Sequence, residues 1–358
     1  MALKLEYKSY TLDFKFDAGT SRGILKQKTV WYLKVYQPDR TFEYGIGEVA
    51  TLEGLSVDYK ADMEFELALL TDKIIKSKMP TSVEGVYSLV KQLVSEKLPS
   101  IKFGLETALL DLINGGKKEI FANGFYQSEK NIPINGLVWM GDKAFMKKQI
   151  DEKIKAGFKC IKIKIGAIDF EEEIKLLRYI KSTYSDELTL RVDANGAFTT
   201  QKAILKLKAL QEFDLHSIEQ PIMPNQIMSM KLLCAKSIVP IALDEELVGV
   251  NGKVNKAELL NEIKPQYIIL KPSLLGGFHE TSEWIKLAKE RNIGWWITSA
   301  LESNIGLNAI CQFTSEYKVN MHQGLGTGML YKNNFDSPLT IKGESIYYNQ
   351  KENWGAVF

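Results

Sequence analysis

The feature that most limits the fold of this chain is a regular succession of short β-rich runs after residue 130. Their starts lie about 27 residues apart, which is the length of one βα unit, and amphipathic helical stretches separate them. Eight such units in roughly 200 residues predict a (β/α)8-type barrel. An open doubly wound sheet is disfavoured, because no G-x-G-x-x-G phosphate loop opens a helix. The runs are 132–138, 160–165, 188–193, 215–220, 239–244, 266–271, 294–299 and 319–324.

The first hundred residues follow a different pattern. Apolar and polar residues alternate over 3–8, and the β-rich runs 29–36 and 44–49 follow, so this part predicts strands. Helical spacing begins at Asp62. Strands followed by helices are typical of a separate α+β unit.

The last residues are expected to complete that N-terminal unit. The stretch 337–349 alternates like strands, and no further helical pattern follows it. We therefore predict an α/β protein with an N-terminal α+β capping domain over 1–100, to which 335–358 return. The (β/α)8-type barrel is predicted to occupy 101–334.

Composition excludes several classes of partner. The chain has 46 Lys and Arg against 44 Asp and Glu, a net charge of +2, which offers no field for nucleic acid or an anionic membrane. Three widely separated cysteines, Cys160, Cys234 and Cys311, suggest a reducing compartment and no metal cluster. The start lacks the basic-then-apolar pattern of a signal peptide, and no run reaches the length of a membrane span. We expect a cytoplasmic protein.

Carboxylates end three successive predicted strands of the barrel. Asp193, Glu219 and Asp244 stand at the strand ends where barrel enzymes hold their sites. At about 4 Å, each like-charge pair costs on the order of 4 kcal/mol at an effective dielectric near 20. A divalent cation removes that cost, and an all-oxygen ligand set favours Mg²⁺ over zinc.

Lysines end the strands on either side of these carboxylates. Lys162 and Lys164 are two residues apart in an apolar strand, so both point to the same side, into the barrel. Four other Lys-x-Lys pairs have no such setting and are interpreted as solvated faces. Lys271 ends the sixth strand. Burial and a neighbouring ammonium both lower a lysine pKa, so a neutral amine base is expected here.

This arrangement resembles the enolase superfamily, muconate-lactonizing subgroup, over nearly the whole chain. The pattern is Lys-x-Lys, then Asp, Glu and Asp on three strands, then Lys. In that superfamily a Lys or His base works with Mg²⁺. Within the subgroup, RVDANGAF, SIEQPI, IALDEEL, YIILKPSLLGGF, SALESNIGLNAI and QGLGTG are most similar to the o-succinylbenzoate synthase family of menaquinone biosynthesis.

The resemblance implies a role for each residue. Lys164 would remove the proton α to a carboxylate, and Lys162 would keep Lys164 deprotonated. Lys271 would stabilise the enediolate intermediate as a cation. Return of the proton to a departing hydroxyl would release water and leave an aromatic ring. One Mg²⁺, which binds the substrate carboxylate, would be held by Asp193, Glu219 and Asp244.

Substrate contacts and alternatives are less defined. Asn195, Ser299 and Gly324 are candidate contacts to a small carboxylate substrate. The stretch 326–328 carries no acid, unlike dipeptide epimerases that bind an ammonium there, which favours a succinyl side chain. N-succinylamino-acid racemisation, dipeptide epimerisation and cycloisomerisation remain alternatives, and the loop 19–28 is expected to decide among them.

Other classes of protein also stay open. A Schiff-base aldolase would use Lys164 or Lys271 but leaves the three carboxylates unexplained. A non-catalytic binding protein would have no need of the complete set of charged residues. A homo-oligomer is compatible with the sequence.

Overall fold

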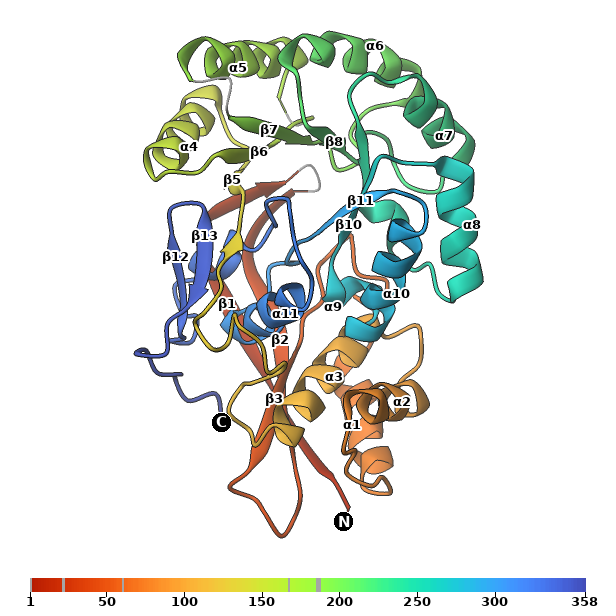
Figure 1. The fold of residues 1–358 in the computed structure, drawn as a ribbon, viewed down its shortest axis with the longest axis vertical. Coiled ribbons are helices and arrows are strands. Elements are labelled where there is room, and N and C mark those ends of the chain that lie inside the picture. The colour runs from red at the N-terminus through yellow and green to blue at the C-terminus, as the bar shows by residue number, and fades with distance from the viewer. Residues whose placement is uncertain (1, 21–22, 60, 167, 185–187) are drawn as a thin grey trace.

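The computed structural model describes residues 2–20, 23–59, 61–166, 168–184 and 188–358. Figure 1 shows a long antiparallel sheet with helices on one side, and above it a curled parallel sheet with an outer row of helices. These two parts correspond to the predicted cap and barrel architecture.

The cap sheet has the three predicted strands, in the order β1-β2-β3, but two of them are much longer than predicted. Pairing of β1 with β2 runs from Lys4–Tyr36 to Thr20–Gly23, so the hairpin reaches the barrel (Figure 1). The alternation of buried and exposed side chains continues beyond residue 8, as the burial of Leu12 and other apolar residues shows. Ser21, in the predicted loop, lies outside the described residues. The bounds are β1 Lys4–Thr20, β2 Gly23–Tyr36 and β3 Tyr44–Val49.

Three helices cover this sheet: α1 Met63–Ile74, α2 Val83–Leu93 and α3 Pro99–Ile113. The predicted helix start at Asp62 is confirmed, since its side chain accepts the amide N–H of Phe65. Glycine at position 47 lets α3 lie directly on β3. A Cβ there would lie 1.9 Å from the carbonyl oxygen of Gly104.

The barrel wall is a seven-stranded parallel sheet in the order β11-β10-β9-β8-β7-β6-β5. The eighth predicted strand, 319–324, is wrong as a strand: Gln323 and Gly324 form only isolated bridges, to Ile134 and Thr298. One reason is that the side-chain Oε1 of Gln323 accepts the amide of Ile297, 2.8 Å away. The bounds are β5 Gly136–Val138, β6 Cys160–Lys164, β7 Thr189–Asp193, β8 Ser217–Glu219, β9 Ile241–Leu243, β10 Tyr267–Leu270 and β11 Gly294–Ile297.

The first predicted barrel strand, 132–138, is divided between two sheets. Its first part, β4 (Ile132–Pro133), pairs with the tail hairpin β12 (Leu339–Lys342) and β13 (Ser345–Tyr348), and only β5 joins the barrel. The amide of Ile134 is bonded to Glu344, outside the barrel sheet.

The tail strands thus pair with β4 and not with the cap sheet. The segment just before them does contact the cap: the amide of Lys15 donates to Leu330, and that of Lys332 donates to Asp13. The division of the chain into 1–100, 101–334 and 335–358 stays a prediction.

Helices on the outer face connect the barrel strands. Asp169 caps α5 by accepting the amide of Glu171, and α8 ends two residues before Pro265. No helix in the described part of the chain is long and apolar enough to cross a bilayer. The bounds are α4 Lys143–Lys155, α5 Phe170–Thr183, α6 Thr200–Leu210, η1 Gln211–Phe213, α7 Ile227–Lys236, η2 Glu245–Leu247, α8 Lys253–Ile263, α9 Pro272–Leu275, α10 Phe278–Lys289, α11 Asn304–Ser315 and η3 Gly326–Met329.

Candidate active site

A cavity of about 600 Å³ lies between the cap and the carboxyl ends of the barrel strands. The cap contributes residues 23–25 at the start of β2 and residues 52–55 after β3. The predicted loop 19–28 is wrong as a loop over 19–20 and 23–28, which belong to β1 and β2, but residues 23–25 of this segment do line the cavity. Most of the sequence-predicted site residues line it too, namely Lys162, Lys164, Asp193, Asn195, Lys271, Ser299 and Gly324.

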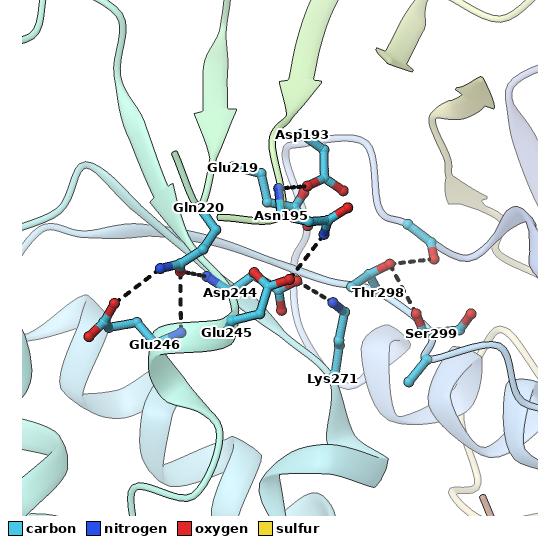
Figure 2. A network of polar contacts seen from close by, with 12 residues as sticks. Asp193, Asn195, Glu219, Gln220, Asp244, Glu245, Glu246, Lys271, Thr298 and Ser299 are labelled. Atoms are coloured by element: carbon cyan, nitrogen blue, oxygen red, sulfur yellow. Dashed lines mark hydrogen bonds and ion pairs between the residues drawn. The ribbon is translucent and has the colours of Figure 1, made fainter. Parts of the chain in front are cut away.

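Strand register brings the charged side chains to one level. Lys164 on β6 is paired with Asp193 on β7, and Asp193 is paired with Glu219 on β8. Asp244 and Lys271 directly follow β9 and β10. Because these strands are neighbours and parallel, their ends meet at one edge of the sheet, as Figure 2 shows for Asp193, Glu219, Asp244 and Lys271.

The lysines and carboxylates form a buried network of ion pairs. Lys162 Nζ lies 2.9 Å from Glu219 Oε2 and 3.1 Å from Asp193 Oδ2. Lys164 Nζ lies 3.0 Å from the same Asp193 oxygen, and Lys271 Nζ pairs with Asp244 Oδ2. The three lysines thus neutralise the three carboxylates locally, as buried charges require.

These contacts raise the pKa values of two of the lysines, Lys162 and Lys271. Burial alone would lower the pKa of Lys162, but Asp193 and Glu219 outweigh it, so this pKa is raised. Burial is likewise outweighed at Lys271, chiefly by Asp244, and its pKa is raised. The predicted lowering of lysine pKa values is therefore wrong for Lys162 and Lys271, because each contacts a carboxylate directly.

The carboxylates shift in opposite directions. At Asp193 burial is overcome by Lys162 and Lys164, and the pKa is lowered. Burial, assisted by the charge of Asp193, raises the pKa of Glu219. Two neighbouring carboxylates with opposite shifts are typical of functional sites.

The carboxylate oxygens at the strand ends are the kind of ligand that a divalent cation such as Mg²⁺ prefers. Asp193, Glu219 and Asp244 supply buried carboxylate oxygens, and Glu219 Oε1 has no hydrogen-bond partner among the described residues. As the side chains stand, no three His, Cys, Asp or Glu residues in the described ranges are grouped as a metal site. The lysines hold the carboxylate oxygens instead, so these ion pairs must rearrange for a cation to share all three. The three ligands stay a prediction.

Asn195 connects two parts of the site that sequence reasoning treated separately. Its Oδ1 accepts a hydrogen bond from Lys164 Nζ at 2.6 Å. Its Nδ2 donates to Glu245 Oε1 at 3.0 Å, as Figure 2 shows. The carboxamide thus positions the amine of Lys164. Sequence reasoning missed Glu245, although it directly follows Asp244.

The hydroxyl-bearing side of the cavity lies after β11. Thr298 Oγ1 donates to the carbonyl of Gly324 at 2.9 Å, and the hydroxyls of Ser299 and Thr327 are hydrogen-bonded to each other. A Cβ at position 324 would lie 2.1 Å from Thr298 Oγ1, so glycine is required for this contact. Thr298 and Thr327 were not predicted.

A buried lysine of the cap is hydrogen-bonded to the part of the cavity wall that follows β11. Lys28 Nζ donates to the carbonyls of Ala300 and Leu301, at 2.7 and 2.9 Å. Leu301 has a φ of 63°, which is uncommon for a side chain of this kind, and Tyr331 also donates to its carbonyl. The cap strand β2 therefore fixes part of the cavity wall.

Comparison with known proteins identifies the family. Residues 146–355 match the model described as enolase C-terminal domain-like. The chain is 46% identical to the o-succinylbenzoate synthase of Desulfotalea psychrophila, over 95% of this chain and 98% of that protein. The crystal structure of MenC from the same organism superimposes with a TM-score of 0.87 at 41% identity, covering 97% of this chain and all of that one.

A more distant structure shares the fold. The dipeptide epimerase of Enterococcus faecalis, complexed with Mg and a dipeptide, has a TM-score of 0.85 at 19% identity and covers 99% of both chains. The predicted barrel with an N-terminal cap is confirmed by these neighbours. The chain belongs to the enolase superfamily and, within it, to the o-succinylbenzoate synthase family.

Proposed function

We propose that this protein is a Mg²⁺-dependent lyase that dehydrates 2-succinyl-6-hydroxy-2,4-cyclohexadiene-1-carboxylate to o-succinylbenzoate. The observation that carries the proposal is that Lys164 on β6 and Lys271 after β10 line one cavity and flank the three strands that end in carboxylates, of which Asp193 also lines the cavity. The 46% sequence identity to an o-succinylbenzoate synthase, over 98% of that protein, supports this reaction over a Schiff-base aldolase or a binding protein.

The lysines perform the proton transfers in this proposal. Lys164 Nζ, as a neutral amine, takes the proton from the carbon α to the ring carboxylate, and the electron pair moves into an enediolate. The bond from carbon to the hydroxyl then breaks, and Lys164 returns its proton to that hydroxyl. One water leaves and the ring becomes aromatic. Lys271, on the other side, stabilises the intermediate as a cation.

Asp193, Glu219 and Asp244 would hold the Mg²⁺. When bound, the cation supplies positive charge to the two enediolate oxygens, where negative charge develops. Lys162 is hydrogen-bonded to two of these carboxylates and so affects both their positions and the charge near Lys164.

The cavity walls would bind the rest of the substrate. The carboxamide of Asn195 orients Lys164 and faces the cavity, and Ser299 and the backbone at Gly324 lie on the hydroxyl-bearing side. Apolar cap residues, among them Ile24, Leu52 and Leu55, would cover the ring and exclude water.

The test supplies the cyclohexadiene carboxylate with Mg²⁺ and follows the ultraviolet absorbance of the aromatic product. We expect product formation that stops on chelation and resumes when Mg²⁺ is restored. N-succinyl amino acids in deuterated water form a parallel arm, because racemisation would exchange their α-hydrogen. Exchange there with no aromatic product from the diene would overturn the proposal in favour of a racemase.

We also propose that the protein works in the cytoplasm. Its three cysteines are all free and buried, which suits a reducing compartment. Labelling of intact and lysed cells with a membrane-impermeant reagent tests this, and labelling in intact cells would contradict it.

A further inference from the structure

We propose that Gln220 is a positioning residue that fixes the strand-end carboxylates in the arrangement that binds a divalent cation. This inference rests on the proposed function, because it takes Asp193, Glu219 and Asp244 as the cation's ligands. Gln220 directly follows Glu219, is fully buried, and does not line the cavity. It therefore acts through other residues and does not touch substrate.

The side chain of Gln220 joins the end of β8 to the end of β9. Its Oε1 accepts the backbone amides of Asp244 and Glu246, each at 3.2 Å. Its Nε2 donates to Glu246 Oε2 and to the carbonyl of Ile222, each at 3.0 Å. Figure 2 shows this carboxamide between Asp244 and Glu246, on the side of the carboxylates away from Lys271. The amide of one predicted ligand, Asp244, is thus held directly.

The backbone of Gln220 extends the connection to β7. Its carbonyl accepts the amide of Gly196 at 2.7 Å, and its own amide donates to Ala242 at 2.9 Å. Its φ of 37° is uncommon for a residue with a side chain, and such a conformation persists only when surrounding contacts impose it. Residue 220 is therefore bonded to the segments that follow all three carboxylate-bearing strands.

Only a carboxamide makes this set of contacts. The group must accept two backbone N–H groups and also donate to the carboxylate of Glu246, which itself accepts the amide of Asn225 at 2.9 Å. Glutamate cannot donate in its ionised form, and methionine offers neither function. Loss of such outer partners typically lowers metal affinity about 10–100-fold.

The experiment measures Mg²⁺ binding to the full chain by calorimetry without substrate, together with the melting temperature. Gln220→Met removes all four side-chain hydrogen bonds, and Gln220→Glu brings two carboxylates together. The double variant Gln220→Glu/Glu246→Gln exchanges the partners and retains every contact except the bond to Ile222. Gln226→Met is the matched control, since Gln226 accepts from Thr200 and donates to Met223 away from the carboxylates.

We expect both single variants to bind Mg²⁺ about 10–100-fold more weakly. The exchanged double variant is expected to recover most of this affinity, and the control to keep it. If the single variants melt earlier but bind Mg²⁺ like the wild type, Gln220 is merely structural and the inference is overturned. The same holds if a folded double variant binds no better than Gln220→Glu. Failure of the wild type to bind Mg²⁺ would instead contradict the proposed function itself.

Discussion

Replacing Lys162 by methionine is expected to destabilise the metal-free protein by about 3–5 kcal/mol. Lys162 Nζ lies 2.9 Å from Glu219 and 3.1 Å from Asp193, and all three side chains are buried. At these separations and an effective dielectric near 20, each ion pair is worth about 5 kcal/mol before desolvation. Removing one partner of a buried pair leaves a net cost of about 3–5 kcal/mol, because the lysine's own desolvation cost is also removed.

The same substitution is expected to strengthen Mg²⁺ binding. At the same effective dielectric near 20, a lysine and a divalent cation about 6 Å apart repel each other by about 5 kcal/mol, so removing this charge should tighten Mg²⁺ binding by at least about tenfold. Mg²⁺ should therefore raise the free energy of unfolding of Lys162→Met by more than that of the wild type.

Urea unfolding with chelator and with Mg²⁺ provides the assay, and the exposed Lys155 on α4 provides the control as Lys155→Met. The control is expected to change stability by less than about 0.5 kcal/mol. A Lys162→Met variant as stable as the control without metal would refute the ion-pair argument. An equal Mg²⁺ stabilisation of wild type and variant would refute the predicted charge coupling.

Three other predictions concern catalysis, pH and packing. Lys164→Ala is expected to lower kcat by at least about 10²–10⁴-fold while calorimetry still detects Mg²⁺ binding, and near-normal turnover would exclude Lys164 as the base. Burial raises the pKa of Glu106 to about 8, so its stabilising effect is complete below about pH 4.5 and is lost as pH rises through 8. Urea midpoints of Glu106→Gln should therefore fall less between pH 6 and 9 than those of wild type, and parallel curves would contradict this. Gly47→Ala is expected to cost about 1–3 kcal/mol or more, because its Cβ would meet the carbonyl of Gly104, and an unchanged melting temperature would show that α3 can move away.

Much of the fold and the central charged residues were predictable because they depend on local patterns. Strand spacing revealed the barrel, and the period of two along 160–165 placed Lys162 and Lys164 on one face. Contacts between distant segments were not predictable in this way. The run 132–138 changes sheets at Ile134, whose amide bonds to Glu344, and a side chain of Gln323 replaces part of the eighth strand's ladder.

The electrostatics of the site also depended on distant contacts. The sequence suggested that burial and a neighbouring ammonium would lower a lysine pKa at this site, whereas Lys162 and Lys271 each contact a carboxylate at the end of a neighbouring strand. Lys28 belongs to the segment 19–28 that was expected to decide the substrate, but its hydrogen bonds to Ala300 and Leu301 were not predictable, because those residues lie far along the chain. Gln220 gave no signal except its place beside Glu219.

The central claim is that three acids from adjacent strands share one cation between two lysines. A crystal soaked in Mn²⁺, recorded with its anomalous signal, tests this most directly. We predict a single peak within about 2.0–2.6 Å of oxygens from Asp193, Glu219 and Asp244, with Lys164 and Lys271 on opposite sides of it. No peak at these carboxylates, or a peak held by other residues, would contradict the account.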